Sequence, residues 1–435
     1  MGSQISIPTA VAVGLGAIIG AGIFVLSGTA IAIAGGYALL AFVLVGIAAI
    51  FVSIEMGELS SLMPNETGAS YSFTYKAFGS EIGFITGILL FFSYATSISV
   101  ISLGFGSYLS SLLGVSSTLD IPFAICLIFL LALLNILGIK KAAHADFLLV
   151  IIKVSILLLF VFAALFIAFS SHTFSTSNFS TPKENLIVAI FSASVVIFFA
   201  YSGFQTISTF ASKVKGRNGA SLAMVVATSI SLLLYALVAF SLIALLPASS
   251  YQVSGDPLAF ALKSTHAPEW ILLIVDIGAL VATVSATIAM ILSSSRILYQ
   301  ISKDGLLPKP FRKYDKRRDV AVNGVLVSSI IGIVMLFSGN IYIIAAISNF
   351  GLLFSYLMTS FALIHFRRLG KVGSFKTPLY PYIPVITIIF LFAFIIGMPR
   401  TALLLGTMLI IILLAAYYMF KEVKKKEPVM VRLFD

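Results

Sequence analysis

The sequence predicts an all-α protein that spans a lipid bilayer, and two observations lead to this fold class. Hydrophobic residues make up 60% of the 435 residues, whereas charged residues make up only 10%. Soluble domains carry roughly 25% charged residues, so this chain has too little polar surface to face water on all sides. Its apolar residues are also gathered into long runs, which are typical of transmembrane helices.

Twelve apolar segments can be traced along the chain, each long enough to cross or nearly cross a bilayer. We expect them to be helices, because hydrocarbon offers no hydrogen-bond partner to an exposed backbone. The whole chain, 1–435, is predicted to form a single integral membrane domain with the lipid bilayer as its main partner. The twelve segments are 8–34, 37–63, 81–113, 120–139, 146–170, 185–211, 219–247, 269–300, 321–338, 341–366, 380–397 and 400–420.

Lysine and arginine are distributed unevenly between the two sets of loops, and this predicts the orientation. Loops on one side of the predicted bundle carry the basic set named below, whereas loops on the other side carry only Lys183, Lys263 and Arg400. Basic loops stay in the cytoplasm, so both termini are expected there, with the tail 421–435. The net charge of +11 is thus a topology signal, and no nucleic-acid partner is predicted. The basic set comprises Lys140, Lys141, Lys213, Lys215, Arg217, Lys303, Lys309, Arg312, Lys313, Lys316, Arg317, Arg318, Arg367, Arg368, Lys371, Lys376, Lys421 and Lys424–Lys426.

Two of the segments are interrupted by small and polar residues at mid-membrane depth. Segment 8–34 contains four glycines between Gly14 and Gly22, and segment 185–211 contains the run Phe198–Gln205. Paired interruptions in corresponding positions of two halves indicate a transporter binding site.

The spacing of these interruptions predicts an internal repeat. They lie five segments apart, and because five is odd, a second five-helix unit would insert upside down relative to the first. We therefore expect one repeat at 8–170, an inverted repeat at 185–366 and two additional helices at 380–420.

Two interpretations of the glycine run stay open. Gly16 and Gly20 form a pair with the spacing that allows close helix packing. Alternatively, the glycines permit an unwound stretch, whose free N–H groups and following helix N-terminus can hold a carboxylate. Freed carbonyls in the second interrupted segment would suit an ammonium group. Together the two breaks describe a site for a zwitterion that needs no charged side chain.

Lys153 lies inside the apolar segment 146–170, roughly 10 Å from its basic edge at 1.5 Å per residue. A lysine at the bilayer centre costs about 2.5–3.5 kcal/mol on insertion scales, so its presence calls for an explanation. Its ammonium group could reach the interface by snorkelling. Alternatively, burial favours loss of the proton, which would make Lys153 a proton carrier.

Other ionisable residues in the apolar segments give weaker signals. Glu55 and Glu58 end segment 37–63, where a solvated position and a gate are equally supported. Asp276 lies in segment 269–300, and its role is not predicted. No nucleotide-binding, metal-ligand or hydrolase pattern is present, so we predict no cofactor, no metal and no catalytic residues.

A retinal-type pump and a membrane receptor are the alternatives outside secondary transport. A retinal-type pump uses a buried lysine for its Schiff base, but twelve segments with the lysine in the fifth argue against it. A membrane receptor has no specific support in the sequence.

An ordered set of motifs resembles the amino acid–polyamine–organocation superfamily of permeases over nearly the whole chain. Each motif is short, but their order along the chain makes the set specific. The motifs are Gly16–Phe24, Glu58-Leu59 with Pro64, Gly68 and Tyr71, then Leu134–Lys140, Phe199–Phe204, Ser295-Arg296 and Lys303–Pro308.

The resemblance implies a fold of leucine-transporter type, with five-plus-five inverted repeats and discontinuous first and sixth helices. It implies that backbone groups around the first break bind the substrate carboxylate, that those around the second bind its amino group, and that Phe199 is an outer gate. The implied residues are Ile19, Gly20, Ala21 and Gly22 at the first break, and Phe199, Ala200, Tyr201, Ser202 and Gly203 at the second.

The resemblance also implies that Lys153 is a proton-coupling residue, with the Gly16 carbonyl and a hydroxyl of Thr283 or Ser285 as partners. We therefore predict a proton-coupled amino acid symporter of the plasma membrane that works by alternating access. An amino acid exchanger and a sodium-coupled carrier on the same fold are the alternatives. Gln205 stands where some cation-exchanging members have an acid, which argues against a dibasic substrate.

Overall fold

The computed structural model describes residues 5–66, 68–138, 143–171, 174–179, 185–315 and 317–424, with only the backbone given for Ala21, 143–147 and 420–424. Throughout this part of the chain the secondary structure is helical, apart from two isolated β-bridges, and each predicted apolar segment contains helix. The tail from 425 onward and Lys140, Lys141, Lys183 and Lys316 lie outside the described residues.

The chain runs through fifteen α-helices and six 3₁₀ helices within the described residues. The α-helices are α1 (Ile7–Ile18), α2 (Ala21–Ala34), α3 (Ala38–Leu62), α4 (Ser70–Phe78), α5 (Ser80–Leu113), α6 (Asp120–Leu137), α7 (Ala143–Ser170), α8 (Leu186–Tyr201), α9 (Gly219–Leu245), α10 (Pro257–Ser264), α11 (Glu269–Lys303), α12 (Val322–Met335), α13 (Ile341–Arg368), α14 (Tyr382–Ile396) and α15 (Arg400–Lys424). The 3₁₀ helices are η1 (Gly35–Tyr37), η2 (Ser117–Leu119), η3 (Thr176–Phe179), η4 (Phe204–Lys213), η5 (Ala248–Ser250) and η6 (Lys309–Arg312).

Helix length and composition agree with a multi-pass membrane protein. In the described residues, nine stretches are long and apolar enough to span a bilayer, and one of them, Gly22–Leu62, contains both α2 and α3. Helices α1, α12 and α14 are apolar but shorter. Two short helices, α4 and α10, were not predicted, because each is far below the length of a span and lies between apolar segments.

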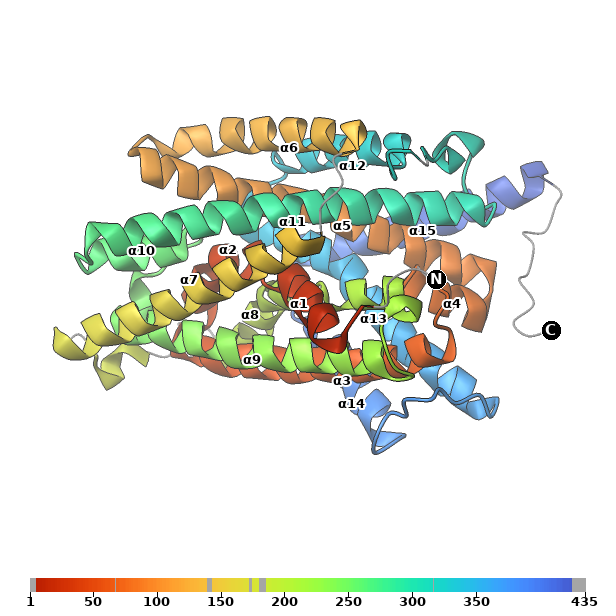
Figure 1. The fold of residues 1–435 in the computed structure, drawn as a ribbon, viewed down its shortest axis with the longest axis horizontal. Helices are drawn as coiled ribbons and strands as arrows, with labels where there is room; N and C mark the ends of the chain where they lie inside the picture. Colours follow the sequence, from red (N-terminus) through yellow and green to blue (C-terminus); the bar gives the residue numbers. More distant parts are fainter. Residues whose placement is uncertain are drawn as a thin grey trace.

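The long helices lie along one direction, with α5 and α11 side by side through the middle of the bundle (Figure 1). Helix α3 packs on α9, α2 packs on α8, and α13 packs on α5. Helix α4 lies at one end of the bundle and α10 at the other (Figure 1). Large apolar side chains on the peripheral helices are exposed, as expected for surfaces that face lipid, including Phe129, Phe162, Ile330, Ile389 and Ile411.

Both predicted interruptions are breaks in the helices. Helix α1 ends at Ile18, and α2 begins at Ala21 after Gly20, whose φ and ψ of −103° and −149° are not helical. Helix α8 ends at Tyr201, and the chain continues as the tighter η4 after Gly203. Gly203 has a φ of 134°, which only glycine adopts without strain.

The two breaks are in direct contact through backbone rather than through side chains. A Cβ atom added to Gly22 would lie 2.3 Å from the Cα atom of Ala200. One added to Gly203 would lie 2.5 Å from the carbonyl oxygen of Ala17. Glycine is therefore required sterically at both positions. The glycine run is interrupted as a helix between Ile18 and Ala21, and Gly22 at its end also allows close packing of α2 on α8.

The close contact at Gly22 leads us to expect that one added methyl group destabilises the protein. Gly22→Ala should lower the thermal unfolding temperature of the purified protein, because the clash is with backbone and overpacking costs about 1–3 kcal/mol. Gly219→Ala is the control, since its added Cβ would face only the side chains of Val214 and Ile7. Equal unfolding temperatures for the two variants would contradict the close approach of α2 and α8.

Candidate transport site

One side chain joins the two helix breaks. The Tyr235 hydroxyl, from α9, lies 2.8 Å from the carbonyl oxygen of Ile18 and 3.2 Å from that of Ala200. Both carbonyls lie at helix ends, where the usual helical partners four residues on are missing. The Ile18 carbonyl also accepts the Gly20 backbone N–H at 2.7 Å. The tyrosine is fully buried, so its hydroxyl replaces the partners that lipid cannot supply.

Sequence reasoning missed Tyr235. A signal was present, because this residue carries the only side-chain polar atom between Leu232 and Phe240 in an otherwise apolar run. The sequence alone does not say that this hydroxyl faces the two breaks, since α9 follows the second break and the first lies more than 200 residues away.

The residues predicted to bind substrate are held in a closed arrangement. The side chains of Ile19, Phe199, Ala200, Tyr201 and Ser202 are at most 5% exposed. The Ser202 hydroxyl donates to the Phe199 carbonyl at 2.7 Å. Gly20, Gly22 and Gly203 contribute backbone only, and Ala21 is described by its backbone as the first residue of α2.

A cavity of about 490 Å³ reaches one side of both breaks. Gly16 and Ala17 line it just before the first break, and Gln205 and Thr206 line it just after the second. The predicted substrate-binding residues do not line it; the nearest lining residues along the chain are Ala17 and Gln205, two residues from Ile19 and from Gly203. The cavity extends along α11 toward Arg296 and Asp319, at the end of the bundle where the α11–α12 connection lies.

Lys153 forms part of the cavity wall although it is only 1% exposed. Its Nζ atom lies 3.3 Å from the Gly16 carbonyl oxygen and 3.3 Å from the Ser285 hydroxyl. The Thr283 hydroxyl instead donates to the carbonyls of Ala279 and Leu280 in its own helix. Of the two hydroxyl partners expected for Lys153, the structure therefore brings Ser285 to the ammonium group and directs Thr283 elsewhere.

The rim of the cavity near the α11–α12 connection is polar. Arg296 forms an ion pair with Asp319 at 3.1 Å, and the Tyr314 hydroxyl donates to the other Asp319 oxygen at 2.5 Å. Burial and this hydrogen bond to a carboxylate raise the pKa of Tyr314 to about 12. Tyr314 therefore keeps its proton near neutral pH and remains a donor to Asp319.

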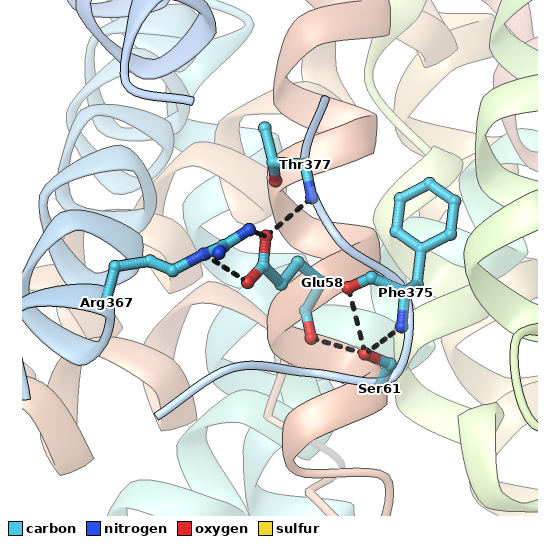
Figure 2. Close-up of polar contacts among 5 residues, drawn as sticks. All are labelled: Glu58, Ser61, Arg367, Phe375 and Thr377. Carbon is cyan, nitrogen blue, oxygen red and sulfur yellow. Dashed lines mark hydrogen bonds and ion pairs between the residues drawn. The ribbon is translucent and has the colours of Figure 1, made fainter. Parts of the chain in front are cut away.

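Glu58, a predicted gate candidate, lies outside the cavity lining. Its carboxylate forms a bidentate pair with Arg367 of α13, at 2.7 and 3.0 Å, and accepts the Thr377 backbone N–H at 2.7 Å. Figure 2 shows these three contacts converging on one carboxylate. Glu55, one turn earlier, accepts a hydrogen bond from Ser360 of α13.

Asp276 is 1% exposed, and its Oδ1 atom has no hydrogen-bond partner within the described residues. It also lies outside the cavity lining. The geometry gives this residue no part in the site.

Removal of the Tyr235 hydroxyl should loosen both breaks at once. We expect faster backbone hydrogen exchange in Tyr235→Phe at residues 15–24 and 198–206, because a lost buried hydrogen bond costs about 1 kcal/mol. Tyr251→Phe is a matched control, since its buried hydroxyl lies 2.6 Å from the Leu242 carbonyl, away from the breaks. Exchange at the breaks that is the same in both variants would contradict the bridging role.

Comparison with known proteins identifies the family to which the chain belongs. The methylthioribose transporter of Bacillus subtilis is 26% identical over 400 residues, which cover 86% of this chain and 84% of the relative. The branched-chain amino acid permease BcaP of the same organism is 26% identical over 443 residues, covering 95% and 92%. Among solved structures, a mutant manganese transporter from Eremococcus coleocola shares the fold, with a TM-score of 0.61, 15% identity and coverage of 98% and 96%. The amino acid permease family model matches residues 5–420, and the chain therefore belongs to the amino acid permease family.

Proposed function

We propose that this protein is a secondary active transporter of amino acids, driven by protons and working by alternating access. The observation that carries the proposal is the position of Lys153, whose Nζ atom joins α7 to the Gly16 carbonyl of α1 and the Ser285 hydroxyl of α11. These contacts lie at the cavity wall, directly beside the broken helix. A protonatable group in this place can link its charge to the position of α1.

The proposed architecture has twelve membrane spans, with inverted repeats at 8–170 and 185–366 followed by two further helices. Breaks in α1–α2 and α8–η4, which occupy corresponding positions of the two halves, support it. The basic loops support cytoplasmic termini. The proposed location is the plasma membrane. In this orientation the cavity would open to the cytoplasm, as in an inward-facing state of an alternating-access cycle.

The proposed substrate is a small zwitterion. Its carboxylate would be held by the N–H groups at the start of α2, which no side chain caps at Gly20. Its amino group would meet the carbonyls of Phe199, Ala200 and Ser202, in competition with the hydroxyls of Tyr235 and Ser202. The relatives' names include a branched-chain amino acid permease, which makes leucine, isoleucine and valine the first candidates.

The coupling step follows from the hydrogen-bonding capacity of the amine. A lysine ammonium has three donors and no acceptor, so it satisfies both oxygens and binds them through charge-assisted hydrogen bonds. Each such bond contributes about 1.5–3 kcal/mol. Loss of the proton weakens the link between α7, α1 and α11, and frees α1 to move. Protonation would therefore favour one arrangement of α1, and deprotonation the other.

The test is proton-driven uptake in proteoliposomes. We expect Lys153→Ala to abolish accumulation of labelled leucine, isoleucine or valine under an inward proton gradient, because no group remains to couple the proton to α1. Lys153→Arg is the matched control for charge, since arginine stays protonated and should also lose pH-dependent accumulation while keeping the fold. Unchanged pH-dependent uptake in Lys153→Ala would refute the coupling role.

Two alternatives on the same fold can be separated in the same preparation. A sodium-coupled carrier would accumulate substrate under a sodium gradient at fixed pH. The ammonium group of Lys153 argues against it, because sodium would compete for the same oxygens. An obligatory exchanger would take up labelled substrate only into vesicles preloaded with unlabelled amino acid. A screen across the amino acids would identify the substrate in either case.

A further inference from the structure

The connection between α13 and α14, residues 369–381, forms a strap across the ends of other helices. Its Thr377 backbone N–H donates to the Glu58 carboxylate, and its Phe375 backbone N–H donates to the Ser61 hydroxyl at 3.1 Å. The Ser61 hydroxyl in turn donates to the Glu58 carbonyl at 2.8 Å. Figure 2 shows the strap lying along α3 at these residues. The strap is thus bound to the last two turns of α3.

The same strap also reaches the start of α9. The Ser374 hydroxyl lies 2.7 Å from the Asn218 side-chain oxygen and 3.3 Å from the Arg217 carbonyl oxygen. Gly373 passes so close to α3 that an added Cβ would lie 2.5 Å from the Glu58 carbonyl oxygen. One connection therefore binds both α3 and the segment that joins η4 to α9.

That segment continues a wall of the cavity. η4 contributes Gln205, Thr206, Thr209 and Lys213 to the lining, and Arg217 and Asn218 follow four and five residues after Lys213. The start of the chain is bound to the same place, because the Ile5 N–H donates to the Lys213 carbonyl and its carbonyl accepts the Lys215 N–H, both at 2.8 Å. The half-helices α1 and η4 are thereby joined at the end where the cavity opens.

We propose that Glu58 and Arg367 are positioning residues that, through the strap, hold α1 and η4 in the position that leaves the cavity open. This rests on the alternating access proposed above. The opposite wall is formed by α11 and the α11–α12 connection, so closure requires η4 and α1 to approach Arg296 and Asp319. A strap fixed to α3 and α13 holds the exit of η4 on the far side of the cavity from that wall.

The ion pair gives the strap its fixed end. Glu58 is 1% exposed and Arg367 is 16% exposed, and the Arg367 guanidinium also lies 4.9 Å from the centre of the Tyr380 ring, within the strap. Removal of one partner leaves the other charge buried without compensation, which is strongly destabilising for that arrangement. A state in which the strap has moved and the remaining charge is solvated should then gain population.

The test measures how accessible the cavity is, independently of any substrate. Cys126 is the only cysteine of the chain, so Cys126→Ser gives a cysteine-free background. Ser293→Cys then places one thiol in the cavity lining on α11, away from the strap. Labelling by a charged maleimide is followed in nanodiscs, where both faces are accessible. A separate Ser116→Cys protein, with its thiol exposed between α5 and α6, corrects for general changes.

We expect Glu58→Gln and Arg367→Gln each to slow labelling of the cavity thiol at least about twofold, with no change at Ser116→Cys. The double variant should be no slower than either single one, because both changes remove the same ion pair. Ser374→Ala, which leaves the ion pair intact, should slow labelling to a smaller extent. Glu81→Gln is the matched control, because it removes a carboxylate that accepts from Tyr418, outside the strap.

Unchanged or faster labelling in folded Glu58→Gln and Ser374→Ala proteins would overturn the proposal, as would an equal effect of Glu81→Gln. A cavity thiol that does not react in the otherwise unchanged protein would overturn it as well, because no open cavity would be populated. A failure of amino acid uptake, by contrast, would count against the proposed function and leave the labelling result as it stands.

Discussion

Backbone groups at two helix breaks must find hydrogen-bond partners inside the protein, because the bilayer core offers none. The rest of the site depends on how this requirement is met. Gly22 and Gly203 let the breaks touch, which excludes lipid and water from between them. The Tyr235 hydroxyl then supplies a donor to Ile18 and Ala200, one carbonyl from each break. A single side chain therefore makes the stability of either break depend on the position of the other.

The same requirement explains why a lysine is tolerated in the bundle. Lys153 is almost fully buried, and the Gly16 carbonyl that it contacts is one turn before the first break. Gly16 itself has no side chain to obstruct the contact, and an added Cβ there would lie 2.5 Å from Val150 of α7. The glycine run thus does two things, since it breaks the helix and brings α7 close enough for the ammonium group to reach the backbone. In the proposed mechanism, the proton acts on α1 through this contact.

The sequence predicted the parts of the site that depend on local chemistry. Helix breaks followed from small and polar residues at membrane depth, and a lysine in an apolar run indicated a buried amine. Its oxygen partners, Gly16 and Ser285, followed only from the family resemblance. The sequence did not predict Tyr235 at the breaks, because the packing of α9 decides which of its side chains face the two breaks. Nor did it predict the partner of Glu58, since Arg367 lies 309 residues away and only the return of α13 beside α3 brings them together. Nor did it predict that the expected substrate-binding residues lie outside the cavity lining, because this depends on the packing of α2 on α8.

Two charged contacts act on the half-helices α1 and η4 at different places. At the cavity wall, Lys153 links α1 to α7 and α11. Away from the cavity lining, the ion pair of Glu58 and Arg367 fixes the strap, which holds the exit of η4. Because Ile5 joins α1 to the end of η4, neither half-helix can shift without straining the contacts of the other. In the proposed transport cycle a change of state must therefore release both contacts in a coordinated way, and only the lysine lies at the cavity wall. Protonation or deprotonation of Lys153 then triggers the change of state. The strap determines how strongly the equilibrium between the open and the closed cavity favours the open one.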